Sequence, residues 1–363
     1  MNFESRNLEI LPRKPPVPTN NSVLIIMNSH AFYEISNYFD FNDFVTIMAG
    51  ILIIFESVTY KSTTMKKINL FTNISFMLTL FLVFSCKPKP AGESFTFAFL
   101  TDVHLTYERN AVPGFNQAIQ SVNDLKPDFV IMGGDLIMDA LGQRYSYADS
   151  LYNLYNETVK KFNMPVFNTM GNHEIYGIYS QSGADKLNPE YGEKMFEKRL
   201  GELYKSFLHK GWKFMILNSI EDTGKDRYIG KIDDAQIEWI KKELSSTDKN
   251  TPIVISTHIP FITANTQKYV GTTVASDSST VIYNGKEVLD LFSNHNLKLV
   301  LQGHLHSLED IYIDGIHFIT GGAVSSGWWN GPNKGLEEGY VLLTAANNEI
   351  SWKYIDFGWE VKK

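Results

Sequence analysis

The chain of 363 residues contains a single cysteine, Cys86, and no long run of basic residues. One cysteine cannot form an intrachain disulfide or a zinc site built from cysteine alone. The 33 lysines and arginines are outnumbered by 40 aspartates and glutamates, which gives a net charge of −7. This balance argues against a nucleic-acid coat or a basic membrane-surface patch. We therefore expect no nucleic-acid polymer as a partner, and nothing in the sequence predicts a protein partner.

Long apolar runs are also scarce. The mostly apolar run Phe44–Phe55 is shorter than the roughly 20 residues that a membrane-spanning helix requires. The hydrophobic share of 44% is ordinary for a globular protein, which excludes disorder of the whole chain.

Residues 65–86 have the pattern of an export signal. Met65 is followed by two lysines, a mostly apolar stretch and the small residue Ser85, directly before Cys86. The end of this stretch, Val83-Phe84-Ser85-Cys86, resembles the lipobox of bacterial lipoproteins, in which the cysteine is acylated and becomes the new N-terminus. A signal-anchor helix, or a buried helix with an unreactive cysteine, is the alternative.

The lipobox resemblance implies a domain organisation. Residues 1–64 would be a mis-called or disordered extension before the true initiator, 65–85 a signal peptide, 86–94 the lipidated cysteine and its tether, and 95–363 one functional domain. The protein would be exported and anchored by lipid on Cys86 to a bacterial membrane, facing the periplasm or the exterior.

Beyond residue 94, strand-length apolar runs alternate with segments of helical periodicity. The predicted strands are Phe95–Leu100, Asp128–Met132, Val166–Thr169, Lys213–Leu217, Pro252–Ser256 and Lys298–Leu301, followed by Asp310–Ile313, His317–Thr320, Tyr340–Thr344 and Ile350–Ile355. The predicted helices are Phe115–Leu125, Tyr147–Phe162, Lys194–Tyr204, Asp234–Leu244 and Lys286–His295. Such alternation predicts an α/β domain with helices on both faces of a largely parallel sheet.

Polar residues that bind metals follow five of these strands. The segments are Asp102-Val103-His104, Gly134-Asp135, Gly171-Asn172-His173-Glu174, His258 and Gly303-His304-Leu305-His306. In an extended chain, residues two apart face the same side, so Asp102 and His104 are expected to reach one ion together, as are His304 and His306. His30, His209, His295 and His317 have no such neighbours and are expected to be structural or exposed.

Imidazole, carboxylate and amide donors without thiolate suit Mn, Fe or Zn. The number of candidate ligands exceeds the need of one ion and suits two divalent ions that share a bridging carboxylate. Such a pair activates a bridging hydroxide for in-line attack on phosphorus. The residues therefore predict hydrolysis of a small phosphoester.

The ordered motifs D-x-H, G-D, G-N-H-[DE], H and G-H-x-H resemble the signature of the calcineurin-like metallophosphoesterase superfamily. The resemblance extends from Asp102 to His306 and implies a four-layer α/β/β/α sandwich with a mixed sheet, in which the tail strands form part of the second sheet.

The resemblance also implies roles for individual residues. Asp102, His104 and His306 would bind the first metal; Asn172, His258 and His304 would bind the second; and Asp135 would bridge the two. His173 would act as general acid or as a donor to a phosphoryl oxygen. Glu174 would orient His173, or else be a solvated carboxylate.

Departures from the family pattern narrow the substrate class. Protein phosphatases carry an Asp-Arg pair three residues after the bridging aspartate and an arginine before Gly-Asn-His, whereas this chain has Met138-Asp139 and Met170. Purple acid phosphatases have a tyrosine where Met138 stands. The remaining resemblance is to the branch that includes bacterial cyclic-nucleotide phosphodiesterases, and whether Asp139 replaces the missing aspartate stays open.

Substrate contacts are expected from the loops that face the metals. Trp328, Trp329 and Asn330 follow a late strand, and the paired tryptophans form either a stacking wall for a base, sugar or lipid group or a plug at the edge of the core. A non-catalytic metal-binding or ligand-binding lipoprotein on the same scaffold is the alternative to an enzyme.

Overall fold

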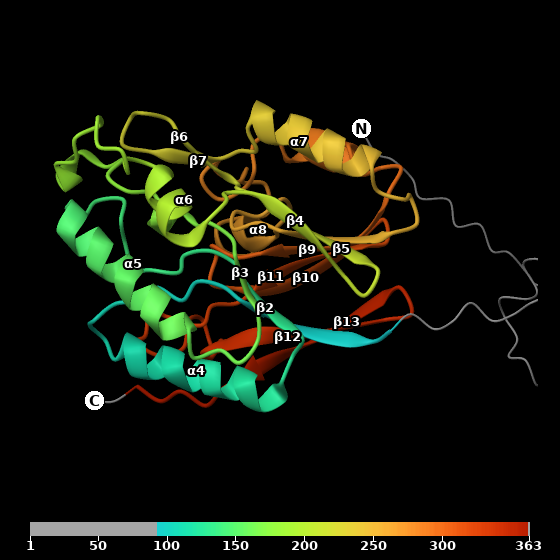
Figure 1. Cartoon of the computed structure of the whole chain (residues 1–363), viewed down its shortest axis with the longest axis horizontal. Coiled ribbons are helices and arrows are strands. Elements are labelled where there is room, and N and C mark those ends of the chain that lie inside the picture. Colours follow the sequence, from blue (N-terminus) through green and yellow to red (C-terminus); the bar gives the residue numbers. More distant parts are fainter. Residues whose placement is uncertain (1–92, 362–363) are drawn as a thin grey trace, which may run out of the picture. The chain divides into compact units, whose positions relative to one another are not determined.

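The computed structural model describes residues 93–361 (Figure 1). The predicted extension, the signal peptide, Cys86 and all but the last two residues of the tether lie outside the described residues. Within the described part, no helix has the length and apolar character needed to cross a membrane.

The first of two mixed sheets contains the opening strand of the domain. Its order is β13-β12-β1-β2-β3, with β1, β2 and β3 parallel and β12 antiparallel to β1. The strands are β1 Phe95–Leu100, β2 Phe129–Met132, β3 Val166–Asn168, β12 Gly339–Ala346 and β13 Glu349–Asp356.

The second sheet has the order β10-β11-β9-β8-β5-β4, and β5, β8, β9 and β11 run parallel. Its strands are β4 Lys205–His209, β5 Trp212–Ile216, β8 Pro252–Ser256, β9 Asn296–Gln302, β10 Leu308–Ile313 and β11 Ile316–Gly321. A separate hairpin is formed by β6 Ile220–Asp222 and β7 Tyr228–Gly230.

The alternation of side chains along β1 explains why two sheets form. Phe95, Phe97 and Phe99 belong to an aromatic-rich core that also contains residues of the second sheet, whereas Ala98 and Leu100 belong to the core on the helix side. The ring of Phe97 stacks on Phe129 of β2 at 5.2 Å between centroids. Because the strand buries both of its faces, a second sheet covers one of them and helices cover the other.

Helices cover the outer faces of the two sheets (Figure 1). On the first sheet, Ser121 of α4 hydrogen-bonds to Tyr340 of β12, and Tyr155 of α5 donates to Asn168 of β3. On the second sheet, Glu243 of α7 accepts from Ser206 of β4. The helices are α4 Ala111–Leu125, α5 Tyr145–Val159, α6 Lys194–Leu200, α7 Asp234–Ser245, α8 Asn265–Tyr269 and α9 Gly285–Asp290.

The four-layer α/β/β/α arrangement is confirmed, but the single sheet inferred from alternation alone is wrong. The tail strands are divided: β10 and β11 join the second sheet, whereas β12 and β13 extend the first. The helix predicted to end at Tyr204 ends at Leu200, where Gly201 has φ 100°, and the following residues form β4. The helix expected over Lys286–His295 is also shorter, since α9 ends at Asp290.

Candidate metal centre

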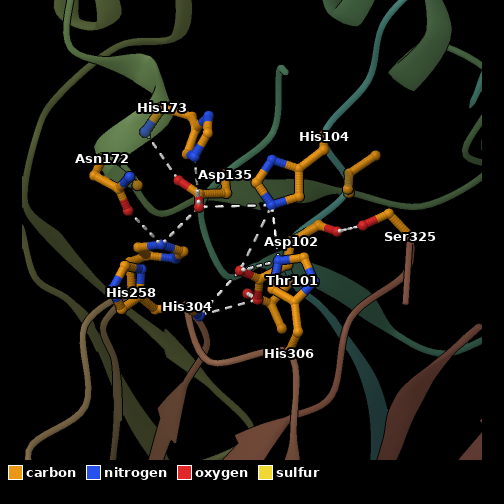
Figure 2. A network of polar contacts seen from close by, with 12 residues as sticks. Thr101, Asp102, His104, Asp135, Asn172, His173, His258, His304, His306 and Ser325 are labelled. Carbon is orange, nitrogen blue, oxygen red and sulfur yellow. Dashed lines mark hydrogen bonds and ion pairs between the residues drawn. The ribbon is translucent and has the colours of Figure 1, made fainter. Parts of the chain in front are cut away.

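The side chains of the candidate site come from loops that follow β1, β2, β3, β8 and β9 (Figure 2). The first three strands are parallel within one sheet and the last two within the other, so their carboxyl ends meet at one edge of each sheet. The residues brought together are Asp102, His104, Asp135, Asn172, His173, His258, His304 and His306.

The paired candidate ligands are oriented toward the site by left-handed backbone, not by extended backbone. The φ angles are 56° at Asp102, 47° at His104, 72° at His304 and 47° at His306. Residues other than glycine rarely adopt this region, and such strain concentrates at sites that the surrounding structure holds in place. The extended-chain explanation for the two-residue spacing is therefore wrong, although both pairs do face the site.

Two motif glycines allow these loops to approach the carboxylates. A Cβ atom at Gly171 would lie 2.1 Å from the backbone nitrogen of Asp135. A Cβ atom at Gly303 would lie 2.1 Å from Oγ1 of Thr101 and 2.8 Å from Oδ2 of Asp102. Close packing against neighbouring ligand loops thus requires glycine at both positions.

Asp102, His104 and His306 form the first candidate metal site, with their ligand atoms within 4.8 Å of one another. Nε2 of His306 lies 2.9 Å from Nε2 of His104 and 3.5 Å from Oδ1 of Asp102. The Thr101 hydroxyl and the backbone N–H of His304 both donate to the Asp102 carboxylate. These bonds hold the carboxylate in a defined orientation before any ion binds.

Asp135, His258 and His304 form a second candidate site. Nε2 of His258 lies 3.1 Å from Oδ2 of Asp135 and 3.1 Å from Oδ1 of Asn172. The same Asp135 oxygen is 3.7 Å from Nε2 of His104, which belongs to the first group. Asp135 therefore lies within reach of both groups.

Hydrogen bonds at Nδ1 determine which ring nitrogen of His258 and His306 faces the site. Nδ1 of His258 donates to the Gly133 carbonyl at 2.9 Å, and Nδ1 of His306 donates to the Ser326 carbonyl at 2.6 Å. Since a carbonyl only accepts, Nδ1 of each ring carries the hydrogen, and Nε2 is the ring atom left to face the site. Nδ1 of His304 is buried and has no hydrogen-bond partner among residues 93–361, as expected of a nitrogen awaiting a ligand.

The ionisation of His104, His304 and Asp135 also suits divalent cations. Burial holds the pKa of His104 well below its ordinary value and lowers that of His304 to about 3, so both rings are neutral, the form that ligates metals. Burial alone would raise the pKa of Asp135, but the charges of His258 and His173 outweigh it and bring that pKa well below its usual range. This donor set of imidazoles, carboxylates and an amide fits divalent transition metals.

Glu174 supports the loop that carries Asp135 and does not touch the His173 ring. Its buried carboxylate accepts hydrogen bonds from the backbone N–H groups of Gly171, Asp135, Leu136 and Ile137. Burial and the charge of Asp135 raise the pKa of Glu174 to about 7. Neither expectation for this residue, orientation of His173 or exposure to solvent, matches these contacts.

Substituting Glu174 with alanine is expected to weaken metal binding about 10- to 100-fold, because groups that orient ligands typically contribute this much. The change leaves the buried N–H groups around Asp135 without an acceptor. Calorimetric titration of the chelator-stripped chain with Mn²⁺ or Zn²⁺ measures the effect. Glu238→Ala, at an exposed glutamate of α7 paired with Lys241, is the control. Wild-type affinity in a folded Glu174→Ala protein would contradict this role.

His173 lies at the rim of the site. Its backbone N–H donates to Oδ1 of Asp135 at 2.9 Å, and its Nε2 is 3.8 Å from Oδ2 of the same residue. Nδ1 donates to the Met138 carbonyl. The side chain is 18% exposed, and Nε2 is the ring nitrogen on the side of Asp135 (Figure 2).

The three residues expected to contact substrate differ in position. Trp328 is partly exposed, with its ring centroid 3.9 Å from that of His104 and 5.5 Å from that of His173. Trp329 is buried in the core, and its indole N–H donates to the Val103 carbonyl at 2.9 Å. Asn330 is exposed, and its amide donates to the backbone of its own turn. One tryptophan thus lies at the site, whereas the other plugs the core.

Tyr228 of β7 is a site residue that the sequence did not reveal. Its ring meets His304 edge to face, with centroids 6.2 Å apart. Burial, with a smaller effect of the Asp135 charge, raises the pKa of its hydroxyl, which therefore stays protonated as a donor. No motif surrounds Tyr228, so only the tertiary structure identifies it.

The remaining described histidines lie outside the cluster. His209 contacts Asp128 at 3.2 Å, and His317 contacts Asp310 at 2.9 Å. His295 lies in the turn before β9. These positions agree with the structural or exposed roles expected of them, and His30 lies outside the described residues.

Residues 95–308, more than half of the chain, match the family model described as calcineurin-like phosphoesterase. The chain belongs to this family. As a calcineurin-like phosphoesterase it is a metal-dependent hydrolase of phosphoric esters, and its clustered histidines and aspartates are candidates for the divalent metals that the family uses.

Two curated relatives and one solved structure illustrate the similarity. This calcineurin-like phosphoesterase is 21% identical over 246 residues to a probable cyclic nucleotide phosphodiesterase of Xenorhabdus bovienii, covering 64% of the chain and 87% of the relative. It is 21% identical to a similarly named protein of Moraxella catarrhalis, covering 61% and 74%. A dimetal phosphatase from Danio rerio shares the fold, with a TM-score of 0.50 and 16% identity over 71% of this chain and 98% of that one.

Proposed function

We propose that the chain hydrolyses small phosphoesters at a dinuclear centre formed by Asp102, His104 and His306 on one side and Asn172, His258 and His304 on the other. The observation that carries this proposal is the position of Asp135. Its Oδ2 atom lies 3.1 Å from Nε2 of His258 and 3.7 Å from Nε2 of His104. One carboxylate that reaches two ligand groups is the arrangement that a bridged pair of ions requires. Mn, Fe and Zn suit the donors.

When bound, two such ions supply polarisation of the phosphoryl oxygens and activation of the attacking water. His173 would supply the proton for the leaving oxygen. Its Nδ1–H is held by the Met138 carbonyl, which leaves Nε2 as the atom that exchanges a proton with the ester. The 18% exposure of the side chain allows the ester to reach it.

The substrate we propose is a small phosphodiester or phosphomonoester. Relatives named as probable cyclic nucleotide phosphodiesterases support a nucleotide diester. Methionine and aspartate at positions 138 and 139, with Met170 buried in the core, argue against the arginine clamp of protein phosphatases.

A metal-reconstitution assay tests the function. The purified chain is stripped with a chelator, supplied with Mn²⁺, Fe²⁺ or Zn²⁺, and assayed with bis(p-nitrophenyl) phosphate, p-nitrophenyl phosphate, cyclic nucleotides, nucleoside monophosphates and sugar phosphates. We expect hydrolysis of at least one ester class that depends on added metal. A protein that binds the metals and hydrolyses none of these esters would favour the non-catalytic alternative.

We also propose that the protein is an exported lipoprotein anchored through Cys86. The support is the sequence Val83-Phe84-Ser85-Cys86 behind a charged and apolar segment. In a bacterial host, Cys86→Ser is expected to lose incorporation of labelled fatty acid and to leave the membrane fraction. Continued labelling of the Cys86→Ser protein would refute the anchor, because the chain has no other cysteine.

A further inference from the structure

The turn over residues 325–329 is bonded to both ligand loops of the first metal site. The backbone N–H and the hydroxyl of Ser325 donate to the Asp102 carbonyl, and the Ser326 carbonyl accepts from Nδ1 of His306. The buried Trp329 donates to the loop between Asp102 and His104. These hydrogen bonds hold the turn against the candidate ligands, and none of them involves the Trp328 side chain.

Trp328 is presented to the site by strained backbone. Its φ is 60°, and that of Trp329 is 65°, both in the region that residues other than glycine rarely adopt. The strain directs one indole into the core and the other over the rings of His104 and His306, at centroid distances of 3.9 and 5.0 Å. Strain retained at such a position is typical of ligand contacts.

The indole N–H groups of the two tryptophans differ in their hydrogen bonding. The indole N–H of buried Trp329 has carbonyl partners, as expected of a structural tryptophan. Among residues 93–361, hydrogen bonds to Trp328 come from Arg109 and Asn330 and reach its carbonyl, not its indole N–H. A partly exposed indole with a free donor, 5.5 Å from the His173 ring, has the features of a surface that contacts substrate.

We propose that Trp328 is the wall on which the organic part of the substrate stacks, so that the site selects phosphoesters carrying a flat aromatic ring such as a nucleobase. The inference rests on the proposed function, since it places the leaving oxygen near His173, and the indole lies beside that residue. Stacking on tryptophan tolerates any base, because every base has a π face. The wall therefore favours substrates with an aromatic ring and does not distinguish one base from another.

A matched pair of substrates tests the wall. Adenosine 5′-monophosphate and ribose 5-phosphate share the phosphate and the primary 5′-oxygen and differ in the base; their methyl esters serve if the enzyme accepts only diesters. On the metal-loaded chain we compare the ratio of kcat/KM values, or, for compounds that are not hydrolysed, the ratio of Kd values by calorimetry. We expect the wild type to prefer the adenosine compound and Trp328→Ala to lower this preference about 5- to 150-fold.

Two variants separate stacking from support of the fold. Trp328→Phe keeps an aromatic face and is expected to retain most of the preference. Trp352→Ala removes a tryptophan whose indole donates to Asp310 on β10, outside the site, and is expected to retain all of it. A merely structural Trp328 would affect both substrates equally and leave their ratio unchanged.

The outcomes are distinguishable. Equal kcat/KM values for the two compounds in the wild type, or an unchanged preference in Trp328→Ala, would overturn the stacking wall while leaving the hydrolytic function intact. If no ester of the reconstitution assay is hydrolysed, but the preference in Kd exists and disappears in Trp328→Ala, the wall stands and the proposed function is refuted.

Discussion

Asp135→Ala is expected to reduce hydrolysis by at least about 10³-fold. Loss of one group that stabilises the transition state typically costs about 10²- to 10³-fold. Asp135 contacts both ligand groups, with its Oδ2 at 3.1 Å from His258 and 3.7 Å from His104. Its removal also takes away the acceptor of the His173 backbone N–H.

The measurement for Asp135→Ala combines kcat at saturating metal with the metal content of the protein and its circular dichroism. Asp290→Ala, at an exposed aspartate paired with Lys286, removes a carboxylate outside the site and serves as the control. We expect near-native circular dichroism, reduced metal content and loss of turnover in Asp135→Ala alone. Unchanged turnover with full metal content would refute a bridging role for Asp135.

His173→Gln is expected to lower kcat about 10²- to 10⁴-fold for esters with alkyl leaving groups, the range typical of a lost general acid. The effect should be much smaller for p-nitrophenyl esters, because p-nitrophenolate leaves without protonation. Metal content should stay near the wild-type value. The first and second candidate metal sites do not include His173 and therefore stay complete.

A leaving-group series tests this assignment, with kcat measured against the pKa of the departing alcohol. A general acid predicts a steeper dependence in His173→Gln than in the wild type. His317→Gln, which replaces a histidine paired with Asp310, is the control. An equal loss of kcat for alkyl and aryl esters would contradict proton donation and indicate a role in binding or in holding Asp135.

The cluster of candidate metal ligands was largely predictable from sequence, because each candidate lies within a few residues of the end of a strand. A strand such as β1 is recognisable from its apolar residues, and Asp102 and His104 come directly after it. Within each sheet, parallel strands place their carboxyl ends together. Asp102 and His306 follow strands of different sheets, and the packing of the two sheets brings them within 3.5 Å. The two sheets followed from the family resemblance and not from the alternation of strands and helices, since strands buried on both faces do not reveal what covers each face.

Residues that act through their neighbours could not be assigned from the sequence. Glu174 follows His173 in the chain, yet its carboxylate turns to the backbone around Asp135, because four N–H groups converge there. The His173 ring bonds instead to the Met138 carbonyl, and a backbone carbonyl has no signature in sequence. Tyr228 reaches His304 from the β6–β7 hairpin, whose place beside the site follows from tertiary packing.

The sequence by itself determined the candidate donor set, its order along the chain and the family, because the chemistry of metal ligands depends on residue types and their spacing. Only the tertiary structure decided how Trp328 and Trp329 divide their roles. The two residues are adjacent and chemically identical, and left-handed backbone at both sends one indole over the His104 ring and the other into the core. The buried position of Trp329 depends on the carbonyls of Val103 and His104, which accept from its indole N–H. These two residues lie more than two hundred positions earlier in the chain.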